Sequence, residues 1–188
     1  MNTLATQRLT LRPLRDDDVF ALAAAVNNNR IARNLLRVPW PYVLDDAHAF
    51  LVHTQTLPPR SAVFAIVLRD HDEPLLGTTG YETDGLNSEL GYWLAENHWG
   101  RGYMREAANA VVEHAFKVSG LERLQSRCFL GNEASRRLLT ALGFRPAGIG
   151  SAYAPVRGKL VTTQNFELSA KEWDLLRTSA RRSKTLVP

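Results

Sequence analysis

The sequence predicts an α/β fold in which a mixed, mostly antiparallel sheet carries helices on both faces. Short runs rich in β-branched and aromatic residues alternate with segments whose apolar residues recur at helical spacing. The early runs are joined by turns of a few residues, which favours antiparallel neighbours. One strand–helix–strand unit spans about 40 residues, and such a crossover makes its two strands parallel with a right-handed connection.

Length and composition are those of one domain. The chain has 188 residues, of which 45% are hydrophobic and 22% are charged. This is enough apolar material for one core. We therefore expect a single domain over residues 1–176 and a polar, basic C-terminal tail over residues 177–188. The basic run Arg181-Arg182-Ser183-Lys184 lies in that tail, where solvated charge is the usual interpretation.

The sequence shows no pattern typical of membrane insertion or export. No apolar run approaches the roughly 18–20 residues that a membrane span requires, and no charged N-terminal region precedes an apolar stretch. The one cysteine, Cys128, cannot form an internal disulfide, which fits a reducing compartment. We expect a cytoplasmic protein that does not associate with membranes.

Charge and motif content argue against several function classes. The net charge is +4, without a basic stripe long enough for a nucleic-acid groove, so specific nucleic-acid binding is not expected. A mild positive excess suits a protein that holds a polyanionic cofactor. No serine has Gly-x-Ser-x-Gly surroundings, which argues against a serine hydrolase. The five histidines show no zinc-site pairing, so no metal is expected.

The N-terminal half contains strands joined by short turns. Alternation over Arg8–Leu14 indicates a strand that a proline closes. Asp16–Asp18 offer a cap for a helix through Val26, which Asn27–Asn29 break. The other elements expected in this half are a helix over 45–56, a strand over 62–69, a turn over 70–74, a strand over 74–81, a turn over 84–87 and a strand over 89–95.

The C-terminal half begins with a change of period. Apolar residues recur at helical spacing from Tyr103 to Ser119, and Gly120 ends the pattern. A second helix over 133–142 stops at Gly143. The remaining elements are a strand over 124–130 and two final strands over 147–156 and 160–169, which form a hairpin turning at residues 157–159.

The residues that favour chemistry concentrate where the strand over 89–95 leads into the helix from Tyr103. Gly100 and Gly102 lie at this junction. The first-turn N–H groups of a helix have no intrahelical partners and carry the positive end of the helix dipole. Glycine lets a phosphate approach the backbone without meeting a Cβ, and Arg101 and Arg105 add full charges. Taken alone, two glycines so spaced fit an ordinary tight turn equally well.

The stretch Trp99-Gly100-Arg101-Gly102-Tyr103-Met104 is similar to the phosphate loop Gln/Arg-x-x-Gly-x-Gly/Ala of the GNAT acetyltransferases. It departs from that pattern at both ends, with Trp99 first and Met104 last, and keeps the central Gly102. The chain resembles in particular the ribosomal-protein N-terminal acetyltransferases typified by RimJ and RimL. Further matches follow in the subgroup's order: Thr6–Leu14, Val38–Tyr42 with Asp46-Ala47, Glu89–Leu94, Asn132–Ser135 with Leu142–Phe144, and Phe166–Leu168 with Glu172-Trp173.

This resemblance implies a GNAT fold with acetyl-CoA as cosubstrate. Its fourth and fifth strands, here 89–95 and 124–130, are parallel and splay apart, and pantetheine enters the gap. The backbone of Trp93 and Leu94 then pairs with pantetheine, and Asn132 bonds to the same arm; helix capping is the other role expected for Asn132. The residues implied at the pyrophosphate are Trp99, Gly100, Arg101, Gly102, Tyr103, Met104 and Arg105.

The implied reaction is direct attack of a primary amine on the acetyl thioester, without a covalent enzyme intermediate. Leu139 lies where many family members carry a tyrosine proton donor, so Ser135 is expected to bond the sulfur; ordinary first-turn helix chemistry is its alternative role. Glu89 is the candidate base, directly or through water, or else an exposed strand-edge glutamate. Trp40 and Tyr42 line the acceptor cleft or merely anchor a loop.

The leading acceptor is a protein or peptide N-terminal α-amine, because the resemblance is to RimJ and RimL. At neutral pH an α-amino group with a pKa near 8 costs about 1 kcal/mol to deprotonate, and a lysine near 10.4 costs roughly 4 kcal/mol. A small-molecule amine is the alternative acceptor. A CoA-binding sensor without turnover is the rival class, favoured by Leu139 and by Thr162, which replaces a usual acid. The sequence leaves monomer or homodimer open.

Overall fold

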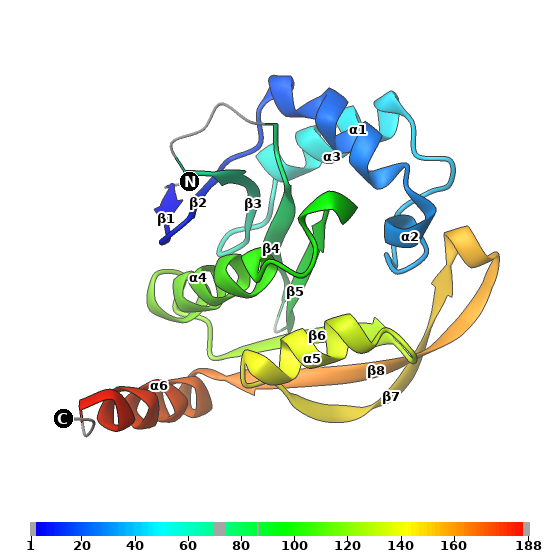
Figure 1. The fold of residues 1–188 in the computed structure, drawn as a ribbon. Helices are drawn as coiled ribbons and strands as arrows, with labels where there is room; N and C mark the ends of the chain where they lie inside the picture. The colour runs from blue at the N-terminus through cyan, green and yellow to red at the C-terminus, as the bar shows by residue number, and fades with distance from the viewer. Residues whose placement is uncertain (1–2, 70–73, 86, 186–188) are drawn as a thin grey trace.

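The computed structural model describes residues 3–69, 74–85 and 87–185 and contains one eight-stranded sheet (Figure 1). Its strands are β1 (Leu4–Ala5), β2 (Leu9–Arg12), β3 (Ala62–Leu68), β4 (Gly77–Asp84), β5 (Asn87–Leu94), β6 (Arg123–Phe129), β7 (Arg145–Ala154) and β8 (Lys159–Ser169). Their order in the sheet is β1-β2-β3-β4-β5-β6-β8-β7. Among the described strands only β5 and β6 are parallel neighbours, which confirms the predicted mixed, mostly antiparallel sheet.

Helices cover both faces of the sheet (Figure 1). They are α1 (Val19–Val26), α2 (Asn29–Ala32), α3 (Leu44–Gln55), α4 (Tyr103–Lys117), α5 (Glu133–Ala141) and α6 (Ala170–Thr185). The alternation of β3 explains the two cores that result. Phe64 and Ile66 pack with α4 in one cluster, and Val63, Ala65 and Val67 pack with α1 and α3 in the other. Because both faces are covered, β3 is a continuous apolar run.

The two parallel strands stay together over a very short distance. The pairing of β4 with β5 extends from Gly77↔Leu94 to Asp84↔Asn87. By contrast, the register of β5 with β6 consists of Glu89↔Gln125, and one residue further the Ser126 hydroxyl donates to the Leu90 carbonyl at 2.9 Å. Beyond this point β6 turns away from β5 and continues with β8, as Figure 1 shows. The strands therefore splay, as the resemblance implied.

Helix α6 is the largest element that the sequence analysis did not predict. Ser169 and Glu172 bond reciprocally at its start, with the Ser169 N–H donating to the Glu172 carboxylate at 3.0 Å and the Glu172 N–H donating to Ser169 Oγ at 3.3 Å. This is a capping box, and Trp173 behind it is 4% exposed in the main core. The segment expected as a basic tail, residues 177–188, thus begins inside a helix that ends at Thr185.

Smaller differences concern ends and turns. Asn28 caps α2 by accepting the Arg30 N–H at 2.9 Å, so a new helix starts where Asn27–Asn29 were expected only to break one. The strand β4 starts at Gly77 rather than at Pro74, and the short strand β1 adds an unpredicted edge. The turn expected over 70–74 lies largely outside the described residues, as does residue 86 of the turn expected over 84–87.

Candidate active site

A cleft of about 1070 Å³ opens where β5 and β6 part. It extends from the start of α4, across the gap between the strands, to α2 and the loop that follows it. The predicted site residues that line it are Tyr42, Glu89, Trp93, Leu94, Trp99, Gly100, Gly102, Tyr103, Met104, Arg105, Asn132 and Ser135. Trp40 and Arg101 are not among its lining residues. The topology therefore brings together segments that are far apart in sequence.

The junction before α4 has the backbone that its two glycines allow. Gly100 has φ +74° and Gly102, the N-cap of α4, has φ +79°, a region that residues with a Cβ rarely adopt. The Glu106 N–H donates to the Gly102 carbonyl at 3.1 Å and so closes the first turn. By the geometry of a helix start, the N–H groups of Tyr103, Met104 and Arg105 are left without intrahelical acceptors. This is an anion-binding arrangement.

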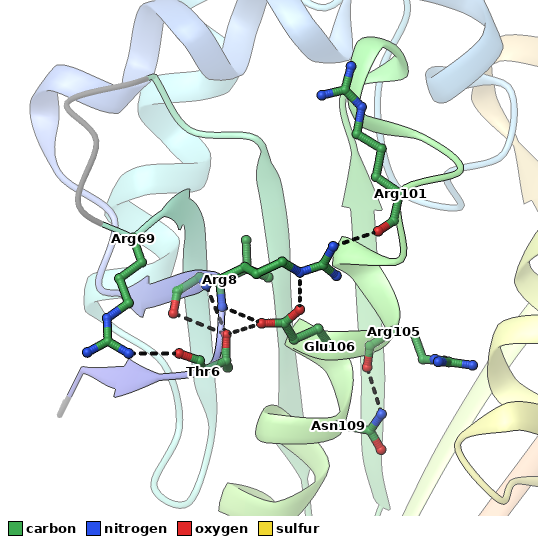
Figure 2. Close-up of polar contacts among 8 residues, drawn as sticks. Thr6, Arg8, Arg69, Arg101, Arg105, Glu106 and Asn109 are labelled. Carbon is green, nitrogen blue, oxygen red and sulfur yellow. Dashed lines mark hydrogen bonds and ion pairs between the residues drawn. The ribbon is translucent and has the colours of Figure 1, made fainter.

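The start of α4 is fastened to the N-terminal strands by a polar cluster (Figure 2). The Glu106 carboxylate accepts from Thr6 Oγ1 at 2.6 Å, from the Arg8 backbone N–H at 2.8 Å and from Arg8 Nε at 2.8 Å. Arg8 Nη1 also donates to the Arg101 carbonyl at 3.0 Å, and the Arg8 guanidinium lies 4.6 Å from the Tyr103 ring centroid. Arg8 and Glu106 thus position the loop, while Figure 2 shows the Arg101 guanidinium directed away from them.

Trp99 connects the same loop to the end of β5. Its indole N–H donates to the Leu94 carbonyl at 2.7 Å, and the Arg30 guanidinium lies 5.3 Å from its ring centroid. Arg30 also pairs with Glu96. Trp99, which departs from the family's loop pattern, therefore connects the loop before α4 to the end of β5.

The start of α5 brings two hydroxyl groups together inside the cleft. Asn132 caps this helix by accepting the Ser135 N–H at 3.2 Å, and Ser135 Oγ lies 2.6 Å from the Tyr92 hydroxyl. Burial raises the pKa of Tyr92 well above its ordinary value, so this tyrosine stays neutral and keeps its proton. The sequence analysis missed Tyr92. The sequence feature that could have identified Tyr92 is the alternation of β5, which places it on the same face as the buried Leu90.

Glu89 lies on the opposite face of β5 from Tyr92, as an odd separation along a strand requires. Its carboxylate is held by two arginines. Arg37 Nη2 donates to Oε2 at 2.6 Å, and Arg127 donates from Nε to Oε1 at 2.9 Å and from Nη2 to Oε2 at 3.3 Å. Neither arginine was singled out from the sequence, because Arg37 lies 52 residues away in the chain. Glu89 is therefore a clamped carboxylate rather than a free edge residue.

A match to a known protein family assigns the chain that forms this cleft. A model described as the acetyltransferase (GNAT) domain matches residues 8–145. The chain belongs to the GNAT acetyltransferase family. A *Bacillus licheniformis* protein described as the uncharacterized N-acetyltransferase p20 is 27% identical over 177 residues, 92% of this chain and 99% of the relative. The ribosomal protein uS5-alanine N-acetyltransferase of *Escherichia coli* K12 is 26% identical over 182 residues, 90% of this chain and 92% of that relative.

Solved structures agree with this GNAT assignment at the level of the fold. *Mycobacterium smegmatis* RimJ in complex with CoA-disulfide has a TM-score of 0.77 and 21% identity, over 90% of this chain and 88% of that one. Together with the family match, the relatives identify an N-acetyltransferase, and the GNAT family uses acetyl-CoA. The predicted family and fold are confirmed.

Other predicted positions of this GNAT enzyme have mainly packing contacts. Tyr42 is 6% exposed in the α1–α3 core, where burial, with Asp46 nearby, raises the pKa of Tyr42 to about 12. Trp40 is half exposed. Leu139 is fully buried, so this position belongs to the core and not to the cleft. Cys128 is 5% exposed, and burial raises the pKa of its thiol, which makes it a poor nucleophile.

The described residues show no cluster for a metal ion and no helix that could cross a membrane. They contain no group of three or more His, Cys, Asp or Glu side chains placed to hold a metal ion; His71 lies outside them. Within the same part of the chain, no helix is both long and apolar enough to cross a bilayer. His114, which the sequence analysis also considered, bonds through Nδ1 to the hydroxyl of the buried Tyr81 at 2.7 Å.

Proposed function

We propose that this chain transfers acetyl from acetyl-CoA to the α-amino group of a protein or peptide N-terminus. The observation that carries the proposal is the splayed gap between β5 and β6, which joins an anion-binding helix start to two sets of polar groups on opposite faces of the sheet. The uS5-alanine N-acetyltransferase among the relatives supports the choice of an N-terminal acceptor.

The N–H groups at the start of α4 are proposed to hold the cofactor pyrophosphate. Gly102 in its left-handed conformation leaves the approach open, and the partial positive charge of the helix start favours an anion there. Arg105 lines the same part of the cleft. The edge of β5 at Trp93 and Leu94 is proposed to bond the pantetheine arm, with Asn132 at the far side of the gap. The residues present therefore fit CoA.

Ser135 is proposed to bond the sulfur as the thioester opens. Either hydroxyl of the Tyr92–Ser135 pair can donate; in the proposed arrangement the neutral Tyr92 donates to Ser135 Oγ, so that the serine proton is available to the sulfur. As the amine nitrogen bonds to the acetyl carbon, the carbon–sulfur bond breaks and the sulfur gains charge. A hydroxyl donor that strengthens with this charge stabilises the transition state more than the ground state. The hydroxyl pair supplies here the function of the tyrosine absent at position 139.

Glu89 is proposed to receive the proton that the attacking amine loses, directly or through water. Arg37 and Arg127 fix both of its oxygens and leave lone pairs for one further donor. An α-amine with a pKa near 8 needs only about 1 kcal/mol of help at neutral pH, so a clamped carboxylate is sufficient. Because Glu89 and Ser135 approach from opposite faces, proton removal and sulfur stabilisation occur on opposite sides of the reacting carbon.

The test measures turnover and cofactor binding separately. The protein is incubated with acetyl-CoA and three acceptor groups: peptides with a free N-terminus, the same peptides blocked at the N-terminus but carrying lysine, and small polyamines or amino sugars. Released thiol and product mass are recorded, and CoA affinity is measured by calorimetry.

We expect acetylation of the free N-termini alone. Acetylation of a small amine in preference to every peptide would refute the proposed acceptor. CoA binding without turnover of any amine would refute the enzyme in favour of a CoA-binding sensor.

A further inference from the structure

The part of the cleft around Glu89, called here the acceptor side, has an excess of positive charge. Four arginines line it: Arg33 and Arg37, which follow α2, Arg127 on β6, and Arg157 between β7 and β8. Two carboxylates oppose them, Glu89 and its cross-strand neighbour Glu82. We propose that this arginine group selects acceptor peptides that carry a carboxylate in the first residues after the reacting α-amine. The inference rests on the proposed function, because it assumes that the acceptor amine comes to Glu89.

Arg157 is a cation held in place without an acidic partner. Its Nε donates to the Arg33 carbonyl at 3.0 Å, its Nη2 donates to Asn34 Oδ1 at 3.4 Å, and its guanidinium lies 4.7 Å from the Phe129 ring centroid. All three contacts are neutral, and the described residues give Arg157 no carboxylate. Fixed geometry with an unneutralised charge is what a binding site for an anion requires.

Arg37 and Arg127 keep donors for a second anion although both bond to Glu89. A guanidinium has five N–H donors in a planar fork. Arg37 uses Nη2 on Glu89, and Arg127 uses Nε and Nη2, so Nη1 of each has no acceptor among the described residues. Two positive charges against one carboxylate leave an excess of positive charge beside the proposed base. An amine bonded to Glu89 therefore lies next to free guanidinium donors.

The reach of an extended peptide brings its first side chains to Arg37 and Arg127, the two arginines that bond to Glu89. An extended chain advances about 3.3 Å per residue, so the side chains of the second and third residues lie within roughly 7 Å of the α-amine. A carboxylate there replaces water on the arginine donors, whereas a lysine or arginine meets like charge. The preference thus has an attractive and a repulsive part, as selective sites generally do. Because these arginines are partly exposed, the contacts taken together correspond to about tenfold in affinity.

The experiment uses three peptides of equal length that start with serine and share a neutral tail. Their second and third residues are Asp-Glu, Asn-Gln or Lys-Arg. We expect kcat/KM to fall in that order, by about tenfold between the acidic and the neutral peptide. The ratio should shrink as salt is raised from low to physiological concentration, because the arginines are partly exposed.

Two variants and one control assign the effect to the arginine group. Arg33→Gln and Arg37→Gln should each lower the acidic-to-neutral ratio several-fold. Arg33→Gln is the more specific of the two variants, because the Arg33 side chain bonds to none of the described residues. Arg123→Gln removes the same charge from the start of β6, outside the cleft, where Arg123 lies 3.7 Å from Glu167; its ratio should equal that of the unchanged protein.

Binding isotherms of the same peptides to the CoA-saturated protein distinguish failure of the anionic subsite from failure of the proposed function. Equal kcat/KM and equal affinity for the three peptides would overturn the anionic subsite and leave peptide acetylation intact. Absence of turnover with every peptide would overturn the proposed function, and the isotherms would still show whether acidic peptides bind more tightly. Free aspartate acetylated in preference to all peptides would overturn the peptide as occupant.

Discussion

Removing the Glu106 side chain tests whether the cluster of Figure 2 holds the phosphate loop in place. Glu106→Ala deletes three hydrogen bonds, from Thr6 Oγ1, the Arg8 N–H and Arg8 Nε, all at 2.6–2.8 Å. The carboxylate is 17% exposed and the Arg8 side chain is 43% exposed, so Arg8 recovers part of its hydration when the pair is lost. With a net value near 1 kcal/mol for each bond, the free energy of unfolding should fall by about 2–3 kcal/mol.

The assay combines urea denaturation with CoA calorimetry. For a chain of this size, a loss of about 2–3 kcal/mol corresponds to roughly 5–10 °C in Tm. CoA affinity should fall several-fold as well, because Arg8 also bonds to the Arg101 carbonyl at 3.0 Å. The matched control is Glu113→Ala on the same helix, which removes a half-exposed ion pair with Arg177. That pair is worth at most about 1 kcal/mol, and CoA affinity should not change.

The pH dependence of this effect has a defined sign. Burial raises the pKa of Glu106, but the bonds from Thr6 and Arg8 outweigh it and leave that pKa below its ordinary value. A lowered carboxyl pKa gives stability that is present above the unfolded value and lost as the pH falls through the folded one. The difference between the protein and Glu106→Ala should therefore shrink below about pH 4. A difference under about 0.5 kcal/mol at neutral pH, with unchanged CoA affinity, would refute the anchoring role.

Four further substitutions test the cleft. Gly102→Val places a branched side chain at φ +79° where phosphate is proposed to bind, and calorimetry should show CoA affinity at least about tenfold lower with the fold retained; unchanged affinity would exclude the phosphate site. Ser135→Ala should lower kcat with little change in KM for acetyl-CoA, and Tyr92→Phe should lower it less, since Ser135 keeps its own proton; full activity of Ser135→Ala would remove that residue from the mechanism. Glu89→Gln should lose activity most at low pH and recover toward pH 8, where α-amines are already neutral; a deficit constant across the pH range would instead mean a structural role.

The sequence was informative where a residue's role depends on its immediate neighbours. An apolar, β-branched run located β3, and Gly100 and Gly102 marked the helix start, because backbone conformation is a local property. Helix α6 was also locally encoded, by Ser169 and Glu172, but the polar residues that follow obscured it.

Contacts across the cleft could not be predicted in the same way. Tyr92 reaches Ser135 across 43 residues of sequence, and Arg127 reaches Glu89 across 38. Such pairs exist because β5 and β6 meet at one register position before they part. No pattern of spacing in the chain encodes that meeting point, since it depends on how the crossover helix α4 packs against the sheet, where it contacts β2, β4 and β5. The charge of the acceptor side was hidden for the same reason.

The single register pair Glu89↔Gln125 joins two halves of one sheet, and on the proposed function the pantetheine arm occupies the gap between them. On the proposed function, the amides of the pantetheine arm bond to the edge of β5 beyond this pair. A ligand bound there acts as an added strand, so the free energy of unfolding rises with the ligand concentration. At one hundred times its Kd, it adds about 2.7 kcal/mol to the free energy of unfolding. The thermal stability and protease resistance of the chain then rise with the concentration of that ligand.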